Sequence, residues 1–275
     1  MTPALELLHG FRPDLQIGVF VEDRFAAVFE GNPAVSAILS PTYGRILRWR
    51  PGLCLNLHGG TRSHLLTLAS LAPIKVGFGH YRPVFFYDVK IPRAQEILGV
   101  ERVTHTAEQL ASAMFHLGVP VSEVPRARLF AEPAPAPRPY AVIHPTAAMA
   151  YKVWPPERFV EVAGYLERER DLEPVIIGAA GDDLAPFRRY RTVAGAPLGR
   201  LKSLLAGASL FVGNDSGPAH VACAFGVPVV VLFGRPDLQV VWSPWHAVAA
   251  RTLCSPEGIS SIQTSAVIAA IRELT

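Results

Sequence analysis

The segment 209–220, SLFVGNDSGPAH, contains residue types that together can bind an anion. A strand is predicted to end near Gly213, and a helix is predicted to begin a few residues later. Asp215 or Ser216 can cap that helix by accepting hydrogen bonds from its free backbone N–H groups. Gly217 has no side chain, so a ligand can approach the backbone there. The unpaired N–H groups and the positive end of the helix dipole suit a diphosphate.

His220 lies one turn along the same helix from Ser216, so its ring can face the same ligand. These residues fit an ordinary junction between a strand and a capped helix equally well. The segment alone does not decide between the two interpretations, and the neighbouring loops must do so.

The loop within HPTAAMAYKVWPPERF (144–159) follows another predicted strand. Thr146 can donate a hydrogen bond to a phosphate, and Lys152 can place a positive charge on it. A lone lysine in a loop is also common on a solvated surface. Trp154 is expected to pack beside the helix that the following prolines begin, rather than to stack on a base.

A third predicted strand is followed by GAAGDD (178–183). Asp182 or Asp183 can accept hydrogen bonds from ribose hydroxyls, as acidic residues do in dinucleotide sites, and either can instead cap a helix. Ligands of open α/β sheets lie at the carboxyl ends of the strands. The three loops together therefore predict one nucleotide site.

The first half of the chain has one comparable loop, HGGTRSH (58–64), after a predicted strand. Arg62 can hold a carboxylate or phosphate by paired hydrogen bonds, and Ser63 stands beside it. The nine histidines show no HExxH motif and no clustered spacing, and the GxSxG and GxxxxGK[ST] motifs are absent. The sequence therefore predicts no metal and no cofactor.

Runs of Val, Ile and Leu alternate with amphipathic segments in both halves, which indicates parallel strands covered by helices on both faces. The proline-rich segment 131–139 predicts a linker. We therefore expect an α/β fold of two facing Rossmann-like domains, residues 1–130 and residues 140–275. Strands are predicted within 15–22, 52–59, 75–79, 140–145, 174–180, 209–214 and 228–234, and helices within 4–11, 24–32, 63–72, 105–118, 155–170, 198–208, 217–226 and 265–274.

The composition excludes several classes of protein. The net charge is +3, which is too small to indicate a nucleic-acid-binding protein, and the whole excess of Lys and Arg lies in the first half. Three widely spaced cysteines form no disulfide framework. The longest apolar run, 221–234, is shorter than the roughly 20 residues that span a membrane, and the chain begins without a secretory signal. We expect a cytoplasmic protein.

With these residues identified, a family resemblance follows. DSGPAHVACAFGVPVVVLFG (215–234) resembles the signature of the ADP-heptose:lipopolysaccharide heptosyltransferases, glycosyltransferase family 9: Asp-[Ser/Thr]-Gly-x-x-His, Ala-x-Gly-x-Pro, then Phe-Gly. KVWP (152–155) is similar to the Lys-x-Trp-Pro element of that family. The segments 3–35 and 55–66 resemble it as well, so the elements occur in order along nearly the whole chain.

The resemblance implies two Rossmann-like domains of the glycosyltransferase B type, with the sugar nucleotide held by the second. It implies transfer of heptose from ADP-heptose to a lipopolysaccharide core, with inversion and without a metal, and a peripheral contact with the inner membrane. Thr146, Lys152, Ser216 and Gly217 would bind the diphosphate of the donor. Asp215 would contact the sugar or its phosphate, and Asp182 or Asp183 would contact the ribose. His220 would also belong to the donor site. Lys152 would also stabilise the departing ADP, and Arg62 and Ser63 would contact the acceptor.

The chain departs from the family pattern at its start. Family members open with a strand and a Leu-Gly-Asp turn before the Pro-Ala-Leu helix, and that Asp is the proposed general base. Here Met1 and Thr2 stand where the segment should end, so we expect the first strand of the first domain and the base to be missing. Asp23 and His58 are the candidate replacements.

Two explanations of this departure stay open. In the first, the start is assigned too late, and the full protein is an ordinary transferase. Alternatively, the short form binds a nucleotide sugar without efficient transfer. A sugar-nucleotide epimerase on the same architecture is a weaker third hypothesis, because the acid and base residues that it needs cannot be placed.

Overall fold

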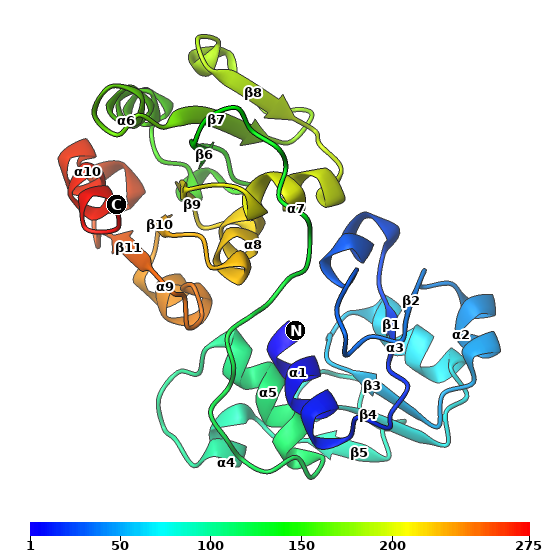
Figure 1. Cartoon of the computed structure of the whole chain (residues 1–275). Helices are drawn as coiled ribbons and strands as arrows, with labels where there is room; N and C mark the ends of the chain where they lie inside the picture. The colour runs from blue at the N-terminus through cyan, green and yellow to red at the C-terminus, as the bar shows by residue number, and fades with distance from the viewer. The chain divides into compact units, whose positions relative to one another are not determined.

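The computed structural model describes residues 1–275, which form two compact units, Met1–Pro125 and Arg126–Thr275 (Figure 1). The proline-rich segment 131–139 belongs to the second unit, where the backbone N–H of Ala134 donates to the carbonyl oxygen of Ser203 over 2.9 Å. None of the helices combines the length and the apolar character that crossing a lipid bilayer requires.

The second unit is built on one parallel six-stranded sheet in the order β11-β10-β9-β6-β7-β8. Its strands are β6 (Tyr140–His144), β7 (Glu173–Gly178), β8 (Arg191–Ala194), β9 (Leu210–Asn214), β10 (Val229–Phe233) and β11 (Ala250–Cys254). Its helices are α6 (Pro156–Glu169), α7 (Leu198–Ala206), α8 (Gly217–Phe225), α9 (Pro236–Trp242) and α10 (Thr264–Arg272).

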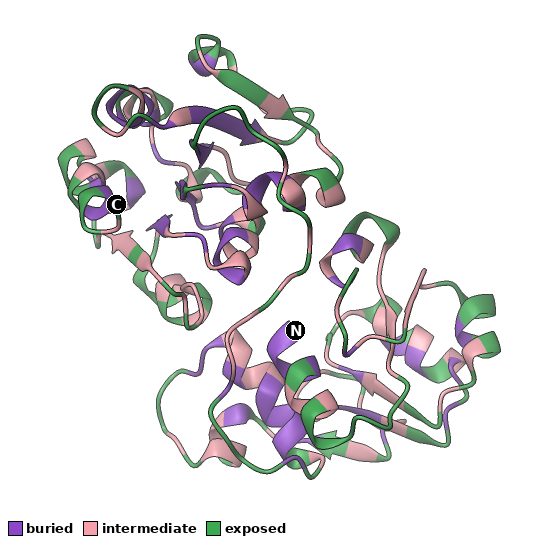
Figure 2. Cartoon of the chain, viewed as in Figure 1, coloured by how far each residue is buried: buried purple, intermediate pink, exposed green.

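Alternate residues of the central strands belong to two separate hydrophobic cores, one on each face of the sheet. One face of the sheet packs against α6 and α10, and the other packs against α7 and α8 (Figure 1). In β6, for example, Ala141 and Ile143 belong to the first core, whereas Tyr140 and Val142 belong to the second. Figure 2 shows these strands as buried, which explains why they read in the sequence as unbroken apolar runs.

The order of the strands fixes where a ligand can bind. The chain builds β6, β7 and β8 outward in one direction and then returns to place β9 on the other side of β6. The two adjacent strands β6 and β9 therefore send their following segments to opposite faces, and ligands of open α/β sheets bind at the carboxyl ends of such a strand pair. The predicted nucleotide loops follow β6, β7 and β9, so they meet at this point.

The first unit has two small parallel sheets. One pairs β1 (Gly18–Phe20) with β2 (Ala37–Leu39), and the other has the order β3-β4-β5, from β3 (Leu53–Asn56), β4 (Ile74–Phe78) and β5 (Val89–Ile91). Its helices are α1 (Thr2–Phe11), α2 (Tyr43–Trp49), α3 (Thr61–Ala69), α4 (Ala94–Leu98) and α5 (Thr106–His116), and α1 packs against α5. β1 and β3 are not paired with each other.

The predicted strands and helices are all present, with one change of type. The helix expected at 24–32 is a 3-10 helix over Asp23–Val28. Elements that sequence reasoning missed are short: β2, α2, β5, α4, β8, α9 and β11. They have three to seven residues each, which is too short for a periodic pattern to register.

Candidate functional site

The carboxyl ends of β6, β7 and β9 bring together side chains from three loops. Thr146 and Lys152 come from the loop after β6, Asp182 from the loop after β7, and Asp215 and Ser216 from the loop after β9. Thr146 contacts Asp182 and Lys152 contacts Asp215, so the loop after β6 is in direct contact with both other loops. The sequence grouped these loops because each follows a predicted strand of the same sheet.

Lys152 and Asp215 form an ion pair in which Nζ donates to Oδ2 over 2.5 Å. The Asp215 side chain is only 5% exposed and the Lys152 side chain 21%, so solvent screens this pair weakly. The carboxylate fixes the position of the ammonium group and offsets much of its charge. Lys152 therefore offers its remaining N–H donors to a phosphate as an oriented group rather than as a free cation.

The first turn of α8 has no side-chain cap. Ser216 is the residue before the helix, but its hydroxyl lies 3.0 Å from the carbonyl oxygen of Asn214 and 2.8 Å from Nδ1 of His144. The expected capping by Asp215 or Ser216 is therefore wrong, because Asp215 is paired with Lys152 and Ser216 with these two partners. An added Cβ at Gly217 would meet open space. An anion can reach this helix end without displacing a protein group.

His144, the last residue of β6, connects the three loops. Its Nδ1 faces Ser216, and its Nε2 lies 3.3 Å from Oγ1 of Thr146, which donates to Oδ2 of Asp182 over 2.5 Å. The same carboxylate oxygen accepts the backbone N–H of Ala179 over 2.7 Å. Sequence analysis did not single out His144, although its place at the end of a buried strand was visible.

Burial lowers the pKa of His144 to about 4, and the nearby carboxylate of Asp182 opposes this shift only in part. The ring is therefore neutral at neutral pH. Its proton affinity is lower in the folded protein than in the unfolded chain, whose histidine pKa is near 6.5. The stabilising contribution is complete above about pH 6.5 and is lost as the pH falls toward about 4.

We expect the free energy of unfolding to fall by roughly 3 kcal/mol between pH 7 and pH 4 because of this residue. Urea unfolding at several pH values, followed by circular dichroism, measures the effect. His144→Gln should flatten the dependence over this range, whereas the exposed His116→Gln should leave it unchanged. Equal pH profiles for wild type and His144→Gln would show that the shift is absent.

The remaining predicted donor residues lie elsewhere. Asp183 accepts the backbone N–H of Ala185 over 2.9 Å, in the turn that leads into the short 3-10 helix Ala185–Phe187 after β7. The ring of His220 lies edge-on to Trp242 of α9, with centroids 6.2 Å apart. Trp154 is fully buried beside Phe159 and donates from Nε1 to a backbone carbonyl, as the sequence predicted for a packing residue.

Two further residues hold the loop that carries Lys152. Asn214 is fully buried, donates to the carbonyl oxygen of Pro145 over 2.9 Å and accepts the backbone N–H of Trp154 over 3.2 Å. Gly234 follows β10, and a Cβ there would lie 2.1 Å from the carbonyl oxygen of Tyr151. Asn214 lies in the segment 209–220 and Gly234 ends the segment 215–234, but the partners of both are distant in the chain and could not be predicted from the sequence.

In the first unit, Arg62 lies in the first turn of α3 and is largely exposed. Its Nη1 is 3.3 Å from Oε1 of Glu22, at the carboxyl end of β1. The Ser63 hydroxyl donates within its own turn, to the carbonyl oxygens of His58 or Gly60. The Arg62 guanidinium thus lies between Glu22 and the carbonyl oxygen of Pro41 with much of its surface exposed, whereas Ser63 holds its own loop together.

The two candidate replacement bases differ in their surroundings. The carboxylate of Asp23 is exposed and accepts a hydrogen bond from the hydroxyl of Ser40. Nδ1 of His58 accepts the backbone N–H of Gly60 over 3.0 Å, so the neutral ring carries its proton on Nε2. In that tautomer the free nitrogen is a donor, which argues against His58 as a base.

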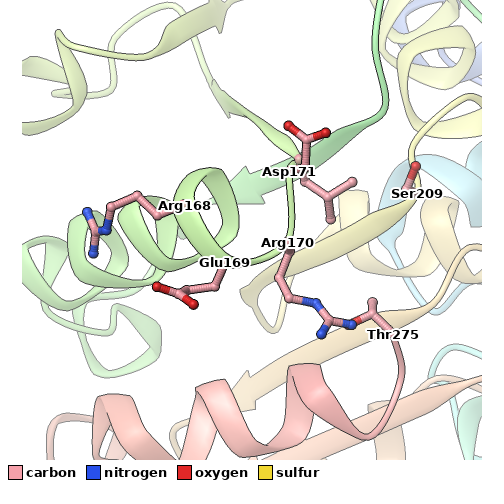
Figure 3. A pocket seen from close by; sticks show the side chains of 7 residues that line it. Arg168, Glu169, Arg170, Asp171, Ser209 and Thr275 are labelled. Atoms are coloured by element: carbon pink, nitrogen blue, oxygen red, sulfur yellow. The ribbon is translucent and has the colours of Figure 1, made fainter.

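One pocket, of about 500 Å³, lies away from these residues. Arg168, Arg170, Asp171, Ser209 and Thr275 are among the residues that line it (Figure 3). They flank the amino ends of β7 and β9, at the edge of the sheet opposite to the nucleotide loops. No three His, Cys, Asp or Glu side chains of the chain are placed to hold a metal ion.

Comparison with known proteins points to one family. The family model for glycosyltransferase family 9 (heptosyltransferase) matches residues 51–258. Lipopolysaccharide heptosyltransferase 3 of Escherichia coli K12 is 34% identical over 116 residues, which cover 38% of this chain and 33% of that protein. The chain's match thus spans about a third of that relative.

Solved structures share the fold over the whole chain. A family 9 glycosyltransferase from Veillonella parvula DSM 2008 has a TM-score of 0.83 at 22% identity, covering 99% of this chain and 92% of that one. An Escherichia coli heptosyltransferase solved with ADP has a TM-score of 0.79 at 18% identity, covering 100% and 95%. At these identities the likeness establishes the fold, two Rossmann-like domains.

Proposed function

Because the chain belongs to glycosyltransferase family 9, the heptosyltransferase family, we propose that it transfers a heptose from ADP-heptose to a lipopolysaccharide core. The observation that carries this proposal is the meeting of Lys152, Thr146, Asp182 and Ser216 at the carboxyl ends of three adjacent parallel strands. A nucleotide needs a diphosphate site and a ribose site at such a point.

We assign the diphosphate to the uncapped start of α8, to the hydroxyls of Thr146 and Ser216, and to Lys152. The diphosphate would approach over Gly217, where no side chain intervenes. Asp182 is the better candidate for the ribose hydroxyls, because it contacts Thr146, whereas Asp183 accepts a local turn hydrogen bond from Ala185. Asp215 orients Lys152 through their ion pair. The proposed contact of Asp215 with the donor sugar would therefore be made next to Lys152.

The proposed reaction proceeds with inversion. An acceptor hydroxyl oxygen attacks the anomeric carbon, the bond from that carbon to the diphosphate oxygen breaks, and ADP leaves with the bonding electron pair. A carboxylate takes the hydroxyl proton, and Asp23 is the candidate in this chain. Lys152 and the positive end of α8 stabilise the negative charge that develops on ADP.

A binding protein without efficient transfer is the alternative, and it is favoured by the surroundings of Asp23, whose carboxylate already accepts a hydrogen bond from the Ser40 hydroxyl. Loss of a positioned base costs roughly 10²–10⁴ in rate. The test is to incubate the full chain with ADP-heptose and a lipopolysaccharide core, and to follow ADP release and the mass of the acceptor. Product that requires both substrates supports transfer, binding of ADP without product selects the alternative, and no binding of ADP excludes both.

The first unit carries a surface suited to the proposed membrane contact. Residues 31–87 contain six Lys and Arg and no Asp or Glu. Apolar side chains are exposed at the amino ends of β3 and β4, where α2 and α3 end: Leu47, Leu53, Leu68, Leu71 and Ile74. Arg48 and Arg50 are exposed beside them, and basic residues among exposed leucines favour an anionic lipid surface.

We expect the chain to sediment with phosphatidylglycerol vesicles and not with phosphatidylcholine vesicles. Each basic residue near such a surface contributes about 1 kcal/mol, so Arg48→Gln with Arg50→Gln should weaken partitioning roughly 30-fold. The exposed pair Arg188→Gln and Arg189→Gln in the second unit is the matched control. Equal losses for both pairs would contradict a specific surface.

A further inference from the structure

The His144 ring lies between two hydroxyl groups, and each hydroxyl has a second partner. Ser216 Oγ lies within hydrogen-bond distance of both His144 Nδ1 and the Asn214 carbonyl oxygen, at 2.8 and 3.0 Å. Thr146 Oγ1 lies within reach of both His144 Nε2 and Asp182 Oδ2, at 3.3 and 2.5 Å. His144 itself is 9% exposed, so water does not replace these partners.

A neutral imidazole has one proton and one lone pair, and each hydroxyl has one proton. Only two arrangements satisfy both ring nitrogens. In the first, the donors run toward Asp182: Ser216 donates to Nδ1, Nε2–H donates to Thr146, and Thr146 donates to the carboxylate. In the second, the donors run the other way: Thr146 donates to Nε2, and Nδ1–H donates to Ser216, whose own proton is then free for the Asn214 carbonyl oxygen or for a ligand.

We propose that His144 is a positioning residue that couples the ribose end of the donor site to the diphosphate end. This proposal rests on the proposed function. Without nucleotide, the donors run toward Asp182, because Thr146 is the side chain that donates a hydrogen bond to its carboxylate. When ribose hydroxyls donate to Asp182, Thr146 turns to Nε2. The ring proton changes from Nε2 to Nδ1 by exchange with water, and Ser216 donates to a phosphate oxygen.

The tautomer of His144 tests the reversal directly. The full chain with ¹⁵N-labelled histidine is examined by long-range ¹⁵N–¹H NMR, with and without ADP, and the His144 signals are identified by their loss in His144→Asn. The expected result is an Nε2–H tautomer without ADP and an Nδ1–H tautomer with it. The same tautomer in both states would overturn the reversal.

A double-mutant cycle tests the coupling by ADP affinity. Asp182→Asn and Ser216→Ala should each weaken binding roughly 3- to 10-fold. In the double variant, the fold-loss of ADP affinity should be smaller than the product of the two single fold-losses by a factor of at least about 3, because both residues belong to one network. In a His144→Asn background, whose amide reaches Ser216 but not Thr146, the two effects should multiply. His144→Phe, which reaches neither partner, should give the same result.

The outcomes separate this inference from the proposed function. No ADP binding by the wild-type chain would overturn the proposed function and the coupling with it. ADP binding in which the two substitutions multiply in the presence of His144 would overturn the coupling alone. Less-than-multiplicative effects that persist in both His144 variants would also overturn it, since the coupling would then run through other residues.

Discussion

Replacing Lys152 by methionine should lower kcat/KM for heptose transfer about 10²–10³-fold, the loss typical of removing one preorganised donor from a developing negative charge. Lys152 lies in the loop after β6, where an ion pair with Asp215, 2.5 Å long, holds its ammonium group in place. The loss should appear mainly in kcat, because the charge on ADP grows as the glycosidic bond breaks. Steady-state kinetics of ADP release measures it.

The substitution has a second effect that must be separated. Lys152→Met leaves Asp215 as an unpaired buried charge, which costs about 3–5 kcal/mol of folding stability. Adding Asp215→Asn removes that charge and should restore stability without restoring transfer. Lys90→Met, at an exposed lysine of β5, should change neither. Recovery of transfer in the double variant would show that Lys152 acts only through the fold.

Gly234→Ala should lower the transfer rate about 100-fold and the free energy of unfolding by about 1–3 kcal/mol. The new Cβ would lie 2.1 Å from the carbonyl oxygen of Tyr151. The clash is with backbone, so the loop must move, and Lys152 is the next residue. A displacement of about 1 Å at a catalytic group is enough for such a loss.

Kinetics at a temperature well below the unfolding midpoint, together with urea unfolding, separates the two effects of Gly234→Ala. Gly44→Ala is the matched control, because an added Cβ in the first turn of α2 meets nothing within 4 Å. It should leave transfer unchanged and leave stability equal or slightly higher. A fully active Gly234→Ala would show that the position of the Tyr151 backbone does not control Lys152.

The sequence predicted the centre of the second unit well because its four inner strands are buried on both faces and because α6, its longest helix, has 14 residues. Val229–Phe233 reads as one apolar run, and α6 keeps a helical period over its whole length. The three nucleotide loops were found because each follows such a strand. In the first unit, three-residue strands such as β2 and β5 carry too little pattern to be detected.

The contacts within the site could not be predicted in the same way. The pairing of Lys152 with Asp215 joins residues 63 positions apart, and that of His144 with Ser216 joins residues 72 apart. Their partners depend on strand order and side-chain direction rather than on local pattern. The capping expected of Ser216 failed for this reason, since a buried histidine on the adjacent strand competes for its hydroxyl.

The central claim is that the loops after β6, β7 and β9 hold a nucleotide diphosphate. Calorimetric titration of ADP into the full wild-type chain and into the Lys152→Met, Asp215→Asn double variant tests it most directly. We predict saturable binding to the wild-type chain at one site and binding at least 10-fold weaker to the folded double variant. Absence of binding to the wild-type chain, or equal affinity for both proteins, would contradict the claim.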